Sequence, residues 1–354
     1  MKKICLILSA LIILISIGLL VIYKIEISSV SNNKDLKEIT VLEGDTYISL
    51  SNKLKENNLI KSEFVYKIYI KLNKVDNLEA GKYYLSENMD LNTIIGILKN
   101  GSTYNENSIS IQFKEGKNMR YITSLIIENT NNKEEDVYNL LKDEEYLDKI
   151  INKYWFLTDE IKNDKIYYSL EGYLFPDTYE FMSKDVTVEE IFEKMLDQME
   201  LKLNDYKEDI NDQKYSIHQL LTLASIVELE GASSNDRAKV AGVFYNRLDE
   251  GWSLGSDITT YYALKMDDWS NGLTYSQLNS CNDYNTRGNC VSGLPVSPVC
   301  NPGIDSIKAV INPEITNNYY FVADCNGVTY LNETENGHYN TINKLKNEGN
   351  WCDN

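Results

Sequence analysis

Hydrophobic residues recur along the chain with two periods, the period of about 3.6 residues of an amphipathic helix and the period of two of a strand. Segments of both kinds occur together from residue 39 onward, and this mixture predicts an α+β fold. In the first part of that region the pattern predicts, in chain order, a short strand at 40–42, helices over 47–57 and 63–72, a strand over 80–85 and a helix over 91–99.

The rest of the chain carries the longer helical patterns. Polar and apolar residues first alternate over 108–113, as they do in a strand. The later elements are expected to be helices over 119–129, 134–153, 187–203, 216–230, 236–250 and 305–311, and a buried strand over 319–322. With 354 residues the chain is long enough for two to three domains and a sizeable core.

The segment 216–231 is apolar on nearly every side of its predicted helix, as in a helix buried in a large core. Ser216 and Gln219 have the spacing of a capping box, which predicts that the helix begins there. Gly231 suits a left-handed C-terminal turn, so the helix is expected to end at Glu230.

Two carboxylates, Glu228 and Glu230, lie at the end of this buried helix. Burial raises the pKa of a carboxyl group, and a raised pKa is what a general acid needs at neutral pH. Residues two apart on a helix point about 200° away from each other, so both cannot face one cleft. Glu230 adjoins the helix end, where a cleft can reach it, whereas Glu228 is expected to be held inside by a partner. The alternative is that both are solvated residues of a frayed helix end, because glutamate is usually exposed.

The N-terminus has the pattern of a membrane anchor. Met-Lys-Lys precedes an uncharged apolar run over residues 4–23, and about 20 apolar residues span the roughly 30 Å hydrocarbon core of a bilayer. The lysines favour a cytoplasmic N-terminus. A cleaved signal peptide is the alternative, but no small-x-small site closes the run. We expect a cytoplasmic tail over 1–3, a single-pass transmembrane anchor over 4–23, a linker over 24–38 and the bulk of the chain outside the cell membrane.

Charge and motifs argue against several classes of function. The formal net charge is −18, and nucleic-acid binding is not expected because it depends on Lys and Arg neutralising phosphates. The sequence contains no H-E-x-x-H, P-loop or G-x-G-x-x-G motif. We therefore expect neither a metal nor a cofactor.

Five cysteines lie in the C-terminal quarter, at Cys281, Cys290, Cys300, Cys325 and Cys352. Their spacing contains no C-x-x-C, so a zinc site is not expected. In an oxidising compartment an odd number allows two disulfides and one free thiol. Cys281 with Cys290 is the simplest pair because the loop between them is short, but the sequence does not settle the pairing.

Several segments resemble the YceG-like family of endolytic murein transglycosylases. They are A-S-I-V-E-L-E-G at 224–231, V-F-Y-N-R-L at 243–248, L-G-S-D-I-T at 254–259, Y-N-T at 284–286, G-L-P at 293–295, N-P-G at 301–303 and L-E-G-Y-L-F-P-D-T-Y at 170–179. The resemblance runs from about residue 39 to 345 and is strongest over 170–311. It implies a catalytic region over 107–354, a mixed α/β domain built around a buried catalytic helix, with its core at about 165–345.

The resemblance implies roles for single residues. Glu230 matches the family's catalytic acid, and Glu228 matches its other glutamate, whose role is supporting. Arg247 could pair with a carboxylate or a substrate oxygen, or form a purely structural salt bridge. The other candidates for supporting the site or binding substrate are Glu171, Tyr173, Asp177, Asn246, Ser256, Asp257, Thr259, Tyr284 and Asn285. His338 falls at the family's T-x-x-E-H, and a lone histidine is more often structural than catalytic.

The loop at 170–179 reads as a rigid aromatic segment, because its proline fixes φ, its glycine permits tight packing and Asp177 can bond its own backbone. We place it against the cleft, with Tyr173 and Phe175 as candidates for stacking on sugars. The alternative is that both rings pack in the core beside the buried helix.

The predicted unit over 39–106 opens with G-D-T-x-x-x-L at Gly44. This motif resembles LysM-like modules, which bind N-acetylglucosamine polymers. The alternative is a small α+β spacer that holds the catalytic region away from the membrane.

The resemblance implies cleavage of the β-1,4 bond between N-acetylmuramic acid and N-acetylglucosamine within nascent glycan strands, which leaves 1,6-anhydro-muramoyl ends. That reaction needs one carboxyl group, whereas ordinary glycoside hydrolases use two. The expected partners are peptidoglycan glycan strands and, from the resemblance, penicillin-binding synthases and other cell-wall assembly proteins. The alternatives are a non-catalytic, membrane-anchored peptidoglycan-binding scaffold and a muramidase that adds water.

Overall fold

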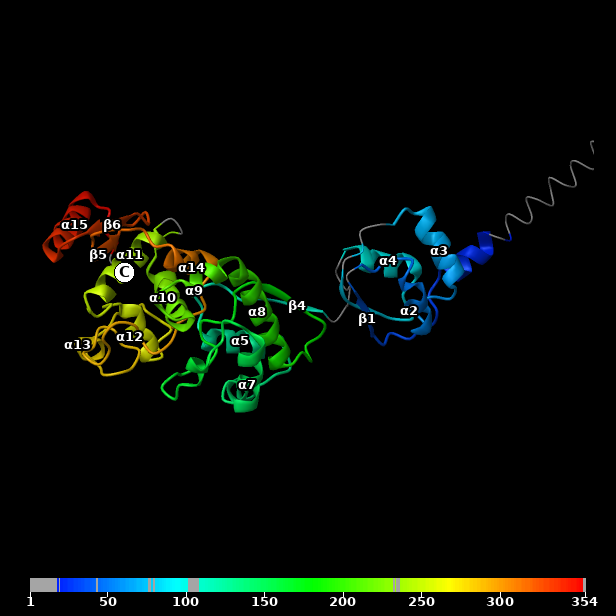
Figure 1. The fold of residues 1–354 in the computed structure, drawn as a ribbon, viewed down its shortest axis with the longest axis horizontal. Helices are drawn as coiled ribbons and strands as arrows, with labels where there is room; N and C mark the ends of the chain where they lie inside the picture. The colour runs from blue at the N-terminus through cyan, green and yellow to red at the C-terminus, as the bar shows by residue number, and fades with distance from the viewer. Residues whose placement is uncertain are drawn as a thin grey trace, which may run out of the picture. The chain divides into compact units, whose positions relative to one another are not determined.

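The protein is described by a computed structural model, in which two compact units, residues 1–108 and 109–354, are each considered separately (Figure 1). The residues that the structure describes are 18, 20–42, 44–75, 78, 80–100, 108–231, 233 and 236–352. The predicted anchor over 4–23 therefore falls almost wholly outside the described residues. Within the described residues, no helix has the length and apolar character needed to cross a membrane.

Over its described residues from 37 to 100, the first unit contains one antiparallel pair of strands and three helices. β1 pairs with β2 so that Lys37 lies opposite Leu85 and Val41 lies opposite Gly81. The bounds are Lys37–Val41 for β1, Leu50–Glu56 for α2, Glu63–Leu72 for α3, Gly81–Leu85 for β2 and Leu91–Asn100 for α4. The predicted α3 is confirmed to the residue because Ser62 caps it by accepting from the Val65 N–H.

The segment predicted as a linker is held against this unit. Residues 20–26 are helical, and the N–H groups of Val30 and Ser31 donate to the Glu87 carbonyl at 2.9 and 3.1 Å. The Lys37 ammonium lies 2.7 Å from a Glu87 carboxylate oxygen. The segment expected to be a linker over 24–38 therefore has hydrogen-bond and ion-pair partners on the folded unit, and its last two residues belong to β1.

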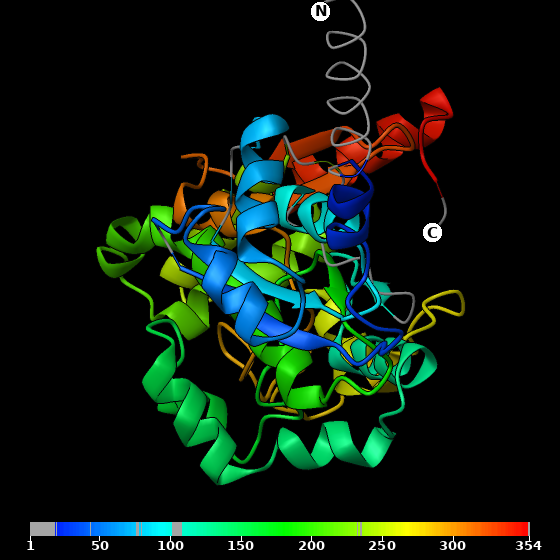
Figure 2. The same ribbon diagram turned by 90° about the vertical axis from the view of Figure 1, so that its right-hand side faces the viewer.

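The second unit is mainly helical and carries two small antiparallel sheets, β3 with β4 and β5 with β6 (Figure 1 and, after a quarter turn, Figure 2). Its elements are β3 Ile109–Gln112, α5 Met119–Asn129, α6 Glu134–Leu140, α7 Glu144–Lys153, η1 Asp159–Lys162, β4 Thr178–Phe181, α8 Val188–Leu203, η2 Asn204–Tyr206, α9 Lys207–Asn211, α10 Ile217–Glu230, α11 Arg237–Asp249, α12 Asp257–Ala263, α13 Tyr275–Leu278, α14 Ile304–Ile311, β5 Tyr320–Ala323, β6 Thr329–Asn332 and α15 Glu335–Glu348. The mixture of helices with small sheets confirms the predicted α+β class.

The predicted buried helix is α10, which lies among α11, α12 and α14 in Figure 1 and packs against all three. Ser216 caps it, and the reciprocal bond from Gln219 completes the predicted capping box. Every residue from Leu220 to Val227 is buried. The helix therefore has the central position that its sequence predicts.

The end of α10 differs from the prediction in one respect. Gly231 has φ −74° and ψ 111°, so the chain leaves the helix in an extended conformation, and the left-handed turn is wrong. A Cβ at this position would lie 2.8 Å from Arg237 Cγ and 2.9 Å from the Val227 carbonyl oxygen. Glycine is therefore favoured at this position because a larger side chain would collide with Arg237 and the Val227 carbonyl.

Two other expectations are corrected, and a third is not covered by the described residues. The single helix expected over 134–153 is two helices, because Asp143 accepts from the Tyr146 N–H and starts α7 as a new helix. The strand expected at 319–322 is β5 at Tyr320–Ala323, and it is half-buried because it forms an exposed hairpin with β6. The residues expected to cap α11, at positions 234 and 235, lie outside the described residues.

Candidate active site

Glu230 is the last residue of α10 and lines a cavity of about 510 Å³. Five other parts of the second unit close around it, namely α11, the 252–257 loop, the loop after α13, the β5 strand and the α15 helix. The side chains that line the cavity with Glu230 are those of Phe244, Arg247, Trp252, Ser253, Leu254, Ser256, Asp257, Arg287, Tyr320, Phe321, Glu335, His338 and Tyr339. Glu230 is half-buried. The alternative considered from the sequence, a solvated glutamate at a frayed helix end, therefore does not describe it.

The surroundings of Glu230 favour its protonated form. Burial raises the pKa of the Glu230 carboxyl, and the neighbouring Asp257 carboxylate raises it further. Ser256 Oγ donates to Glu230 Oε1 at 2.6 Å and favours the charged form, as do the Arg247 and Arg287 guanidinium groups. The net direction is upward, so the carboxyl keeps its proton to higher pH than an exposed glutamate.

Arg287 balances the charge of Asp257. Its Nε lies 2.5 Å from Asp257 Oδ1, and both side chains are about half exposed. Sequence reasoning did not select Arg287. It directly follows the Y-N-T motif, and that adjacency is the signal that could have identified it.

Arg247 does not form the salt bridge considered from the sequence. Its Nε donates to the Tyr319 carbonyl at 2.7 Å, and its Nη1 donates to the Leu254 carbonyl at 2.5 Å. Among the described residues it forms no salt bridge. It therefore joins α11 to the β5 hairpin and to the loop that carries Ser256, and it supplies positive charge beside Glu230.

Glu228 points to the other side of α10 and is saturated with donors. Its Oε1 lies 2.8 Å from Arg237 Nη2, and its Oε2 accepts from the Gly303 N–H at 3.0 Å and from Ser306 Oγ at 2.7 Å. The expectation that a partner holds Glu228 inside is confirmed. Through these bonds the carboxylate fixes the end of α10 to α11 and to the start of α14.

The 170–179 loop lies in the core of the unit. Tyr173 is fully buried and its hydroxyl lies 2.8 Å from His218 Nδ1, while Phe175 is 4% exposed. Neither ring can stack on a sugar, so the core alternative is the correct one. Asp177 does bond its own backbone, accepting from the Thr178 N–H at 2.8 Å, but it lies outside the lining of the Glu230 cavity.

Glu171 is a buried carboxyl that holds three segments together. It accepts from the Met119 N–H and the Tyr262 hydroxyl, both at 2.9 Å, and from Asn301 Nδ2 at 3.0 Å. Burial raises the pKa of Glu171 to about 7, against the effect of these hydrogen bonds. It supports the fold and does not reach the Glu230 cavity.

Four further candidates are also buried or bonded to the protein itself. Asn246 Nδ2 donates to the carbonyl groups of residues 316 and 318 at 2.7 and 2.9 Å. Thr259 Oγ1 donates to the Ser256 carbonyl at 2.7 Å, Tyr284 shares a hydrogen bond with Ser297 at 2.8 Å, and Asn285 is fully buried and joins α12 to the loop after α13. Of these residues, Thr259 contacts Ser256 directly, and the other three join segments of the second unit to one another.

The cysteines agree with the expected pattern. Cys281–Cys290 and Cys325–Cys352 are disulfides, and Cys300 is a buried free thiol. The first disulfide brackets the segment that contains Tyr284 and Asn285. It therefore constrains the loop that leads to Arg287.

The comparisons with known proteins agree with one another. The model of the YceG-like family matches residues 39–344, which confirms the resemblance predicted over 39–345. An endolytic murein transglycosylase of Bacillus subtilis (strain 168) is 33% identical over 308 residues, 87% of this chain and 84% of that protein. The endolytic murein transglycosylase of Streptococcus pneumoniae serotype 2 (strain D39 / NCTC 7466) is 30% identical over 320 residues, and the match spans 58% of that protein. A solved structure of a yceG-like protein from Listeria monocytogenes superposes with a TM-score of 0.62 at 31% identity, over 87% of this chain and all of that one.

Proposed function

Because the chain belongs to the YceG-like family, we propose that it is an endolytic murein transglycosylase, a lyase that cleaves peptidoglycan glycan strands within their length. We assign Glu230 as the single acid and base of this reaction. The observation that carries the assignment is the position of this carboxyl at the end of a buried helix, in a cavity, with a raised pKa.

The first step is protonation of the leaving oxygen. Ser256 occupies Glu230 Oε1, which leaves Oε2 to hold the proton and present it to the glycosidic oxygen between N-acetylmuramic acid and N-acetylglucosamine. As the C1–O bond breaks, the proton moves to the departing 4-hydroxyl and Glu230 becomes a carboxylate. The Ser256 hydroxyl and the charges of Arg247 and Arg287 stabilise that carboxylate.

The second step uses the carboxylate as a base. It removes the proton from the muramoyl 6-hydroxyl, whose oxygen attacks C1 of the same sugar. The product is a 1,6-anhydro-muramoyl end, and Glu230 recovers its proton. Because no water is activated, no second carboxylate is required opposite Glu230, in contrast to the two-carboxylate hydrolases.

The test is mass spectrometry of the ends produced from purified uncrosslinked glycan strands. Wild type should release anhydro-muramoyl ends, and Glu230→Gln should lose at least about 100-fold, the size of effect that a general acid contributes. Glu228→Gln should retain more activity than Glu230→Gln, because it removes a structural contact and leaves the acid in place.

Three results would contradict the proposal. Reducing ends in place of anhydro ends would identify a muramidase. The absence of any cleavage by wild type would favour a peptidoglycan-binding scaffold. Greater loss in Glu228→Gln than in Glu230→Gln would show that the acid is assigned to the wrong residue.

We propose the remaining features on narrower grounds. The apolar run over 4–23 supports a single-pass anchor with the catalytic region outside the cell membrane, and the two disulfides support an oxidising compartment. The G-D-T opening at Gly44 supports a LysM-like role for residues 39–106, with a spacer as the alternative. Work beside penicillin-binding synthases is proposed from the family alone.

A further inference from the structure

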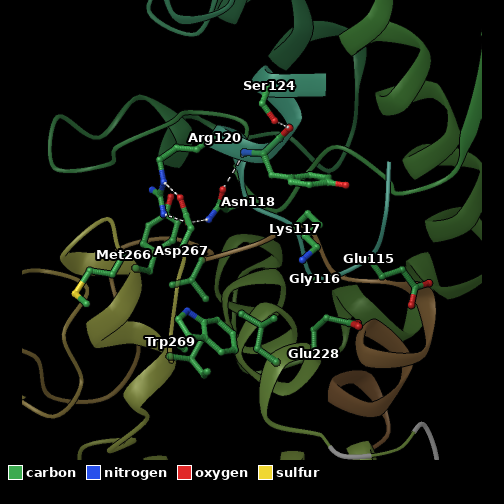
Figure 3. Close-up of a pocket in the computed structure, with 15 residues that line it drawn as sticks. Glu115, Gly116, Lys117, Asn118, Arg120, Ser124, Glu228, Met266, Asp267 and Trp269 are labelled. Atoms are coloured by element: carbon green, nitrogen blue, oxygen red, sulfur yellow. Dashed lines mark hydrogen bonds and ion pairs between the residues drawn. The ribbon is translucent and has the colours of Figure 1, made fainter. Parts of the chain in front are cut away.

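A second cavity, of about 580 Å³, lies beside the Glu230 cavity in the same unit (Figure 3). The turn over 115–118, the start of α5 and the segment 266–269 form its walls, together with one face of α12. The end of α10 separates the two cavities, because Leu229 lines the second and Glu230 lines the first. The start of α12 also lies between the cavities, because Ile258 lines the second and Asp257 lines the first. Consecutive residues of α10 and of α12 therefore line the two cavities.

The second cavity presents one positive group that the protein does not pair. Lys117 is exposed and forms no ion pair with any described residue, and its Nζ lies 5.3 Å from the centre of the Tyr121 ring. Arg120 is paired with Asp267 through Nε and Nη2 at 3.0 and 2.7 Å. The Lys117 ammonium is suited to a carboxylate ligand.

The same cavity also presents a carboxyl group without a partner. Glu115 is exposed and has no ion pair or hydrogen bond with the residues the structure describes. Partial burial of the Glu115 carboxyl and the nearby Glu228 carboxylate raise its pKa. Figure 3 shows Lys117 between Arg120 and Glu115, so donors and an acceptor follow one another along one side of the cavity.

The free polar groups of this cavity are charged. The Tyr262 ring is 4% exposed and Arg120 lies over it at 5.2 Å. Trp269 stacks on Tyr261 at 5.6 Å between ring centroids and is still 42% exposed, so it offers an apolar surface beside the charged groups. Lys117 and Glu115 have opposite charges, which match a zwitterionic ligand.

We propose that this cavity binds the short peptide carried by the muramoyl residue at the cleavage site. The proposal rests on the proposed function. The peptide is attached through the lactyl group of the sugar whose C1 is attacked, so it leaves the substrate close to Glu230. It carries a free carboxylate for Lys117 and, where its third residue is a diamino acid, a free amine for Glu115. The enzyme then prefers peptide-bearing stretches of the strand to stripped ones.

The test measures binding without turnover. Full-length Glu230→Gln protein is titrated with uncrosslinked strands that carry their peptides and with the same strands stripped by an N-acetylmuramoyl amidase. The peptide-bearing strands should bind about tenfold more tightly. Adding Lys117→Met should reduce this ratio to below about threefold, because a carboxylate loses its cation while the backbone of residue 117 keeps its bonds to Asn301.

Lys114→Met is the matched control. Lys114 is an exposed lysine in the segment that leads into the same turn, and it lines neither cavity. This control should keep the tenfold ratio. A third substrate, with the peptide carboxylates amidated, should lower the ratio in the Glu230→Gln protein as much as Lys117→Met does.

Two results would overturn the proposal. Equal affinity of Glu230→Gln protein for both strands would show that the peptide is not bound. An equal loss of affinity for both strands on Lys117→Met would show that the cavity binds glycan. Cleavage of either strand by wild type is scored separately, so failure of the proposed function is distinguishable from failure of the peptide site.

Discussion

The hydrogen bond from Ser256 to Glu230 gives the sharpest test of the acid assignment. Ser256 Oγ donates to Glu230 Oε1 at 2.6 Å and therefore stabilises the carboxylate more than the protonated acid. Ser256→Ala removes this donor and leaves burial and Asp257, which raise the pKa of Glu230. The pKa of Glu230 should therefore rise further in the variant.

The size of the rise follows from the strength of the bond. A hydrogen bond to a charged group contributes about 1.5–3 kcal/mol, and one pKa unit corresponds to about 1.4 kcal/mol. The full bond would thus shift the pKa by about one to two units. Because Glu230 lines an open cavity, water replaces part of the lost donor, and we expect a shift of about one unit.

The assay is the release of anhydro-muramoyl ends as a function of pH. The logarithm of kcat/KM should fall on the alkaline side as free Glu230 loses its proton. In Ser256→Ala this alkaline limb should move up by about one pH unit. Ser253→Ala is the control, since Ser253 lines the same cavity but donates to the Thr286 carbonyl, and its limb should not move.

An alkaline limb that stays in place in Ser256→Ala, or moves to lower pH, would refute the reasoning. It would show either that Glu230 is not the acid or that Ser256 does not stabilise its carboxylate. An equal shift in both variants would point to a general change in the cavity.

Four further predictions concern stability. At pH 8, Glu228→Gln should lower the free energy of unfolding by about 3 kcal/mol because it breaks a buried ion pair. Glu230→Gln should raise Tm at pH 8 but not at pH 4. The folded-state pKa of Glu230 is raised, so this residue destabilises the folded protein only at a pH where its carboxyl is ionised. The pKa of about 7 for Glu171 likewise lies above its ordinary value of 4.5, so wild-type stability in urea titrations should fall by up to about 3 kcal/mol as the pH rises from 5 to above 8, and Glu171→Gln should remove that slope. Gly172→Ala should lower stability by more than about 2 kcal/mol in thermal denaturation, since φ is +87° and a Cβ would lie 2.4 Å from Pro298 atoms. A flat pH dependence in wild type, or tolerance of alanine at Gly172, would contradict the last two.

Local chemistry explains what the sequence could predict. The start of α10 follows from Ser216 and Gln219 alone, because a capping box is satisfied within one turn. The burial of α10 follows from its lack of a polar side, and the exposure of Glu230 to a cavity follows from its place at the helix end. These inferences need only neighbours in the chain.

Contacts between distant segments explain what it could not predict. Tyr173 could line a cleft or a core equally well from its motif, and only the position of His218 decides that it is buried. Arg247 binds carbonyl groups of two other segments, which no motif spacing reveals. Arg287 lies in a loop that the Cys281–Cys290 disulfide closes, and this loop brings it to Asp257. The spacing of the two residues in the sequence does not reveal that they pair.

The packing of α10 has a consequence for genetics. Because α10 is packed against α11, α12 and α14, a substitution that displaces the helix along its axis also displaces the Glu230 carboxyl at its end. Inactivating substitutions should therefore be scattered over residues 220–227, far from any contact with glycan, as well as around the acid itself. A screen for loss of lytic activity would recover variants that still fold but hold the Glu230 carboxyl at the wrong position relative to the glycosidic oxygen.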